Sequence, residues 1–127
     1  VFIYTSVADP ARSDPLEALG AQVIVLPNLD GKVDLPAMLR DLAQRGVNEL
    51  HVEAGHKLNG SFVRERLVDE MLVYMAPQLL GVGTRGIAQW GPLQNLDDAL
   101  PLEFHAVDRV GPDLRLIARI PGRSAFN

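Results

Sequence analysis

Short runs of apolar residues predict the strands of this chain. Residues 1–6 and 23–26 are rich in apolar and β-branched side chains, which is typical of buried strands. The segment 50–53 is predicted as the next strand, and 70–76 forms a further apolar run that ends before a proline. We expect these strands to be parallel, because helical segments separate them.

Helix signals lie between the strands. Asp34 precedes apolar residues at helical spacing over 35–43, and Gly46 follows them. This pattern predicts a capped amphipathic helix. A shorter helix of one or two turns is predicted over 14–20, where an aspartate and a proline stand at the start and a glycine at the end.

The second half of the chain has a different pattern. Residues 81–92 contain four glycines and Trp90, and they predict a loop. Residues 102–110 and 114–120 alternate between apolar and polar side chains around Gly111-Pro112-Asp113, which predicts an antiparallel hairpin.

The order of these elements predicts an α/β fold. Strands and helices alternate as β-α-β-α-β-α-β in the first part, and the chain ends in the hairpin. We therefore expect one mixed sheet, mostly parallel with an antiparallel C-terminal hairpin, and helices on both of its faces.

Composition excludes several classes of protein. The chain has 127 residues, of which 47% are hydrophobic, and a formal net charge of -4. The acidic balance argues against a surface that coats nucleic acid, and no run of about 18 apolar residues is present to span a membrane. Without cysteine the chain has no thiol nucleophile, disulfide framework or zinc knuckle. These features fit a cytoplasmic domain, and we expect no metal, nucleic-acid or membrane partner.

The segment from Leu50 to Phe62 is the strongest candidate for chemistry. It is predicted to form a strand, a glycine loop and a short helix that ends near Arg66. This order turns backbone N–H groups and the positive end of a helix dipole toward a ligand, and phosphates bind at such places. Small residues, Gly55 and Gly60 among them, let a pyrophosphate approach the backbone closely.

Three better-known motifs are excluded in this segment. Gly55 and Gly60 have the glycine spacing of a P-loop, but Ser61-Phe62 replaces the lysine and hydroxyl residue that a P-loop needs. The segment has no G-x-G-x-x-G dinucleotide fingerprint. His51-Val52-Glu53 matches the H-x-E of zinc deaminases, but that zinc site also requires cysteines.

Glu53 is the candidate substrate-binding carboxylate. It ends a predicted strand directly before the glycine segment, and open parallel sheets bind ligands at that end of their strands. A carboxylate there accepts hydrogen bonds from an amide, amine or hydroxyl group. The alternative is a solvated strand end or a structural salt bridge. We assign no catalytic residue.

Other polar residues allow either a binding or a structural role. Thr5 and Ser6 end the first predicted strand at the same kind of edge, where they bind a ligand or cap the following turn. Arg64, Arg66 and Arg85 have the charge to bind phosphate, and the alternative for each is a solvated surface side chain.

Residues 52–81 carry an ordered series of short motifs. The series is Val52-Glu53-Ala54-Gly55, Leu58-Asn59-Gly60-Ser61-Phe62, Leu67-Val68-Asp69-Glu70, Tyr74-Met75-Ala76-Pro77 and Leu79-Leu80-Gly81. Each motif alone is weakly specific, whereas the ordered series of all five is more specific. The series resembles the reductase domain of the bifunctional riboflavin-biosynthesis deaminase/reductase.

The resemblance implies a dihydrofolate-reductase-like fold and an NADPH-dependent enzyme. The reaction that it implies reduces the ribosyl group of 5-amino-6-(5-phosphoribosylamino)uracil to the ribityl form, and the substrate is a phosphorylated pyrimidine. It places Glu53 on the substrate side, and it implies a homodimer. It places the cofactor phosphates along seven residues: Gly55, His56, Lys57, Leu58, Asn59, Gly60 and Ser61.

The chain departs from the family pattern in two respects. His56-Lys57 replaces a smaller pair, and Lys57 either adds charge near a phosphate or is a solvated side chain. Val1-Phe2-Ile3-Tyr4 opens the chain inside a predicted strand, and neither the first strands of the family's reductase domain nor a deaminase domain is found in it. We therefore expect residues 1–127 to be a single domain that is the C-terminal part of a pyrimidine reductase domain.

Two other functions stay open. A non-catalytic structural or dimerisation fragment would pair the apolar run 71–75 and the C-terminal hairpin between subunits. Another dihydrofolate-reductase-like reductase would share the V-E-x-G segment, because this segment does not separate such enzymes by substrate.

Overall fold

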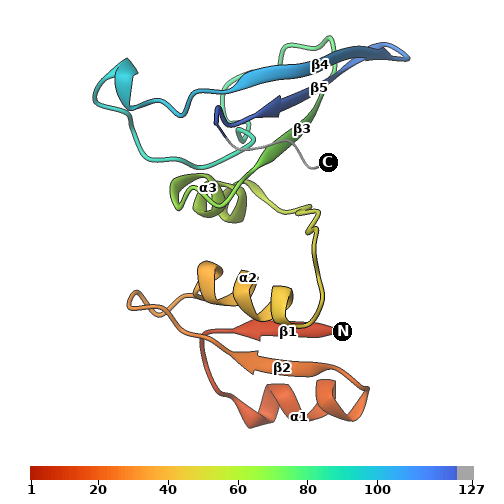
Figure 1. Ribbon diagram of the computed structural model, residues 1–127, viewed down its shortest axis with the longest axis vertical. Coiled ribbons are helices and arrows are strands. Elements are labelled where there is room, and N and C mark those ends of the chain that lie inside the picture. The colour runs from red at the N-terminus through yellow and green to blue at the C-terminus, as the bar shows by residue number, and fades with distance from the viewer. Residues whose placement is uncertain (123–127) are drawn as a thin grey trace. The chain divides into compact units, whose positions relative to one another are not determined.

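The computed structural model describes residues 1–122, which belong to two compact units, Val1–His51 and the part that begins at Val52 (Figure 1). The prediction that residues 1–127 form a single domain stays a prediction. Within residues 1–122 none of the helices is long and apolar enough to cross a membrane.

The first unit contains a parallel pair of strands and two helices. They follow in the order β1 (Phe2–Thr5), α1 (Pro10–Ala18), β2 (Gln22–Val25) and α2 (Leu35–Gln44). β1 and β2 pair in parallel, from Phe2 opposite Gln22 to Thr5 opposite Val25. The helix α1 connects the two strands and contacts β2. This parallel β-α-β unit is the one that the first two apolar runs predict.

The helix α2 agrees with its sequence signals. The Asp34 side chain accepts a hydrogen bond from the backbone N–H of Ala37 at 2.8 Å, which caps the helix. Leu35 and Leu42 are buried, with 5% and 9% of their surface exposed. Gly46 has a φ of +88°, a left-handed conformation that glycine adopts without strain just beyond a helix.

The helix α1 begins earlier than predicted. The N-cap residue is Asp9 and not Asp14, and its carbonyl accepts hydrogen bonds from Arg12 N–H at 3.0 Å and Ser13 N–H at 2.9 Å. Pro10 occupies the first turn, where its missing N–H costs nothing, and Pro15 lies inside the helix. The chain contains two Asp-Pro pairs five residues apart, and the sequence pattern does not show which of them starts the helix.

The second unit contains one α-helix and an antiparallel sheet. Its elements are α3 (His56–Arg64), β3 (Glu70–Met75), a 3-10 helix η1 (Leu96–Asp98), β4 (Glu103–Val110) and β5 (Asp113–Arg119). The strand order is β3-β5-β4, and both pairs are antiparallel. The predicted C-terminal hairpin is confirmed, and Gly111 in its turn has a φ of +60°. His105 lies at an irregularity in the register of β4, between Phe104 and Ala106.

The prediction of a single, mostly parallel sheet is wrong for residues 1–122, although the α/β composition is confirmed. The described residues form two small sheets, and only the β1–β2 pair is parallel. Leu50–Glu53 is not a strand. β3 pairs with β5, from Glu70 opposite Arg119 to Met75 opposite Leu114, and so belongs to the antiparallel sheet. An apolar run predicts a strand but does not specify the neighbouring strand that will supply its hydrogen bonds.

The core of the second unit is small and includes the C-terminal half of α3. Phe62 and Val63 of α3 and Ala118 of β5 each have 5% of their surface exposed. A long connection, residues 76–102, joins β3 to β4, and η1 is its only helix or strand. The predicted loop over residues 81–92 lies within this connection and is confirmed.

Candidate functional site

The glycine segment singled out in the sequence is mostly helix. Gly55 is the N-cap of α3, and His56 to Ser61 are helical, so the predicted loop is wrong for these six residues. The Gly55 carbonyl accepts hydrogen bonds from Leu58 N–H at 3.0 Å and from Asn59 N–H at 3.1 Å, which close the first turn. Glycine at positions 55 and 60 suggested a loop because glycine disfavours helix interiors.

One face of α3 is occupied by the β3–β4 connection. The Gln89 N–H donates to the His56 carbonyl at 2.7 Å, and the Asn59 side-chain amide donates to the Ile87 carbonyl at 3.0 Å. A Cβ atom on Gly60 would collide with the backbone of Gln89, since it would lie 2.8 Å from the Gln89 nitrogen. His56, Asn59 and Gly60 therefore hold residues 87–89 against the helix. The sequence prediction had assigned all three to the cofactor.

A second face of α3 carries Lys57, Ser61 and Arg64. Their spacing of four and three residues places them along one side of the helix. The Ser61 hydroxyl donates to the Lys57 carbonyl at 3.3 Å, and a guanidinium nitrogen of Arg64 donates to the Ser61 hydroxyl at 3.1 Å. Lys57 and Arg64 are exposed, so this face presents positive charge to solvent. Leu58 is also exposed, at 43%.

The start of α3 has the chemistry of an anion-binding site. The N-cap residue Gly55 has no side chain that could cap the first turn of the helix, so it does not satisfy the leading N–H groups through a side chain. Gly55 has open space where a Cβ would stand, which leaves room for a ligand close to the backbone. The helix dipole and the Lys57 ammonium both favour negative charge at this end.

Glu53 lies two residues before the cap residue Gly55 and is exposed. It belongs to the same unit as α3, since that unit begins at Val52. Its backbone is irregular and not the end of a strand. The strand that was to position this carboxylate is absent from the described residues, and the substrate-binding role of Glu53 stays a prediction.

The other candidate residues have mostly structural partners. The Thr5 hydroxyl donates to the Val7 carbonyl at 3.1 Å and accepts from the Val7 N–H at 3.2 Å, so it stabilises the turn after β1. Arg85 is exposed in the long connection. Glu70, the last residue of the Leu67-Val68-Asp69-Glu70 motif, forms an ion pair with Arg119 at 2.7 Å across β3 and β5. Among residues 1–122 no cluster of three or more acidic or histidine side chains is placed to hold a metal ion.

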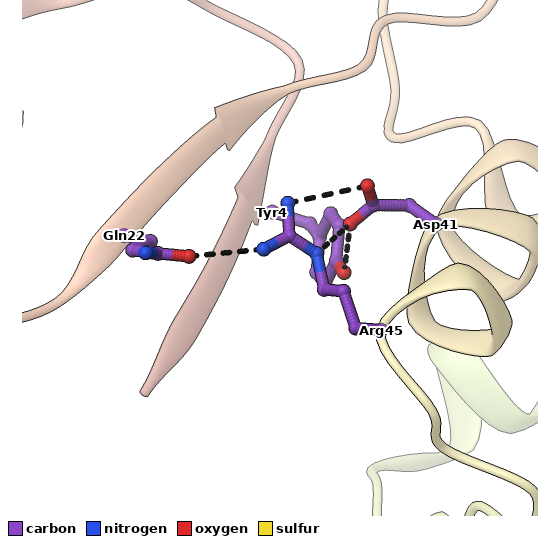
Figure 2. Close-up of polar contacts among 4 residues, drawn as sticks. All are labelled: Tyr4, Gln22, Asp41 and Arg45. Atoms are coloured by element: carbon purple, nitrogen blue, oxygen red, sulfur yellow. Dashed lines mark hydrogen bonds and ion pairs between the residues drawn. The ribbon is translucent and has the colours of Figure 1, made fainter.

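A polar cluster in the first unit was not predicted (Figure 2). The Asp41 carboxylate of α2 accepts hydrogen bonds from the Tyr4 hydroxyl at 2.6 Å and from the Arg45 guanidinium at 2.7 Å. Another guanidinium nitrogen of Arg45 donates to the Gln22 side chain at 2.9 Å. These contacts connect α2 to both β1 and β2. The i, i+4 spacing of Asp41 and Arg45 was the available sequence signal, but it does not reveal the tyrosine.

The cluster shifts the pKa values of its members in consistent directions. The hydrogen bond from Arg45, followed by that from Tyr4, lowers the pKa of the Asp41 carboxyl below its usual 3.8. Partial burial, followed by the hydrogen bond to Asp41, raises the pKa of the Tyr4 hydroxyl above its usual 10.0. At pH values between these two pKa values, the cluster therefore favours a charged Asp41 and a neutral Tyr4.

Comparison with known proteins identifies a family match over most of the chain. The model of the RibD C-terminal domain matches residues 1–116. The chain is 37% identical over 95 residues to the riboflavin biosynthesis protein RibD of Escherichia coli, which covers 75% of this chain and 26% of that protein. It is 33% identical over 120 residues to RibD of Bacillus amyloliquefaciens, which covers 92% of this chain and 32% of that protein.

Further similarities extend to a separately named enzyme and to a solved structure. A 5-amino-6-(5-phosphoribosylamino)uracil reductase of Buchnera aphidicola is 31% identical over 86 residues, which are 68% of this chain and 42% of that enzyme. Acinetobacter baumannii RibD superimposes with a TM-score of 0.78 at 25% identity, over 94% of this chain and 30% of that one. The chain thus spans less than half the length of each of these three curated relatives.

Proposed function

Because the chain belongs to the RibD C-terminal domain family, we propose that it contributes to an NADPH-dependent reduction in riboflavin biosynthesis. The substrate would be 5-amino-6-(5-phosphoribosylamino)uracil, whose ribosyl group is reduced to the ribityl form. The motif series at residues 52–81 and the substrate named for the Buchnera relative support this proposal. The protein acts in the cytoplasm as the C-terminal part of a single pyrimidine reductase domain.

The start of α3 is the proposed binding site for the cofactor diphosphate. The observation that carries this assignment is a helix N-terminus with a glycine cap, no capping side chain and Lys57 in its first turn. These groups fit a diphosphate because they supply backbone donors, a helix dipole and a positive charge at one point. NADPH supplies a hydride for the reduction, and the task of the protein is to bind and orient cofactor and substrate.

The proposal assigns different roles to the seven predicted cofactor residues. Gly55 and Lys57 present the backbone and charge that bind the diphosphate, and Ser61 lies one turn further along, with its hydroxyl bonded to the Lys57 backbone carbonyl. His56, Asn59 and Gly60 support the helix from the other face, and Leu58 lies in the first turn. Glu53 accepts hydrogen bonds from the pyrimidine substrate.

Titration of the protein with NADPH, followed by calorimetry, tests this proposal. We expect saturable binding, and Lys57→Ala to weaken it about two- to fivefold because an exposed charge near a phosphate contributes modestly. Lys32→Ala is the matched control, since it removes the only other lysine of the chain from a turn in the first unit. Absence of saturable NADPH binding by the folded protein contradicts the cofactor assignment. An equal loss of NADPH affinity in Lys57→Ala and Lys32→Ala contradicts the role of Lys57.

A structural role in dimerisation is the second candidate function. It is favoured by exposed apolar side chains on both edge strands of the antiparallel sheet: Tyr74 is 57% exposed on β3, and Phe104 and Val107 are 71% and 55% exposed on β4. Unpaired strand edges with such side chains are prone to associate. A homodimer observed by analytical ultracentrifugation supports this role, and a monomer at all concentrations opposes it.

A further inference from the structure

The long connection between β3 and β4 is fixed to α3 at its middle. Loops of this length without regular structure are usually functional or disordered. Here residues 87–89 are held by two hydrogen bonds to α3, one from the Gln89 backbone N–H and one to the Ile87 carbonyl. The connection is therefore anchored to the helix at a defined point.

Asn59 supplies the only side-chain hydrogen bond in this attachment. Its amide nitrogen donates to the Ile87 carbonyl at 3.0 Å across 28 positions of sequence, so the contact is tertiary. The Gln89 N–H donates at 2.7 Å to the carbonyl of His56, which is the first residue of α3. Both bonds therefore act on the first turn of the helix. Gly60 permits the contact because it has no side chain where the Gln89 backbone lies.

We propose that Asn59 is a positioning residue that holds residues 87–89 against α3 and thereby fixes the backbone that receives the cofactor diphosphate. This inference rests on the proposed function. Helix ends fray, and a frayed first turn does not aim its N–H groups at a phosphate. Holding that turn in its bound conformation lowers the ordering cost that the cofactor would otherwise meet on binding.

The test combines NADPH affinity with hydrogen exchange at the Gln89 amide. Asn59→Leu removes the amide donor with little change in size and adds no charge near the diphosphate, whereas Asn59→Gln retains a donor. We expect Asn59→Leu to speed exchange at Gln89 and to raise the Kd for NADPH about three- to tenfold, the effect of losing one hydrogen bond. In Asn59→Gln both changes should be smaller than in Asn59→Leu. Asn48→Leu, at an exposed asparagine of the first unit, should change neither.

A second measurement needs no variant. In this proposal NADPH binding and the attachment of residues 87–89 to α3 favour each other. Saturating NADPH should therefore slow hydrogen exchange at the Gln89 amide in the unaltered protein. Unchanged exchange there overturns the inference even if Asn59→Leu fails to fold. An unaltered NADPH affinity in a folded Asn59→Leu protein with faster Gln89 exchange also overturns it, while the proposed function stands. If the unaltered protein does not bind NADPH, the proposed function is wrong, and so is the role of Asn59 that rests on it.

Discussion

Gly60→Ala provides the sharpest test of how α3 and the β3–β4 connection fit together. The added methyl group would point at the backbone of Gln89, and its Cβ would lie 2.8 Å from the Gln89 nitrogen. Backbone cannot rotate away as a flexible side chain can. The methyl group therefore fits only if residues 87–89 move off the helix, which breaks the hydrogen bonds from Gln89 to His56 and from Asn59 to Ile87.

Two opposing effects determine the size of the change. A hydrogen bond contributes about 0.5–1.5 kcal/mol to stability, so breaking two costs about 1–3 kcal/mol. Alanine is favoured over glycine in a helix interior by roughly 0.5–1 kcal/mol. The cost of the two broken hydrogen bonds exceeds the gain in helix propensity. We therefore expect Gly60→Ala to lower the free energy of unfolding by about 1–2 kcal/mol.

Urea unfolding, with hydrogen exchange resolved at the amides of α3 and Gln89, measures the effect. Gly81→Ala is the control, because Gly81 lies in the same connection and a Cβ there meets nothing within 4 Å. That variant should be neutral or stabilised by up to about 1 kcal/mol. If Gly60→Ala is as stable as the unaltered protein or more so, helix propensity decides the outcome and the contact with Gln89 is not part of the folded state.

Two further predictions concern ionisable residues. Arg45 lowers the pKa of Asp41, so the carboxylate adds stability at pH values above its unfolded pKa, and this is lost as the pH falls through the lower folded value. Asp41→Asn should flatten the acid side of the unfolding free energy measured against pH, and an unchanged slope contradicts the cluster. Glu53→Gln should leave the NADPH Kd unchanged while weakening binding of the phosphorylated pyrimidine; equal pyrimidine affinity in both proteins removes Glu53 from the substrate site.

Local signals predicted the elements whose causes are local. The α2 helix was found from Asp34, Gly46 and the apolar spacing between them, and the structure shows the cap, the buried face and the left-handed glycine. The C-terminal hairpin was found from its turn and alternating strands. Pairing between distant segments was not found, since the partner of β3 is β5, which lies about 40 positions further along the chain.

The sequence predicted the wrong local structure for the candidate site, and its assignment to the cofactor stays a prediction. Gly55 and Gly60 were interpreted alike, as small residues of a loop that approaches a phosphate. The structure separates them, because Gly55 caps a helix and has open space beside it, whereas Gly60 lies inside the helix against Gln89. A tertiary contact has overridden the low helix propensity of glycine, and no sequence pattern places residues 87–89 at that position.

This separation changes which residues carry the cofactor proposal. Gly60 has a sufficient reason to be glycine in the packing of Gln89, so its identity says nothing about a ligand. A bulky or charged substitution there would weaken cofactor binding by displacing residues 87–89, whether or not a phosphate touches Gly60. Lys57 lies on the other face of α3 and is exposed. It takes part in neither of the two hydrogen bonds that hold residues 87–89. A loss of NADPH affinity in Lys57→Ala therefore reports on the ligand, and the same loss in a Gly60 variant reports on the fold.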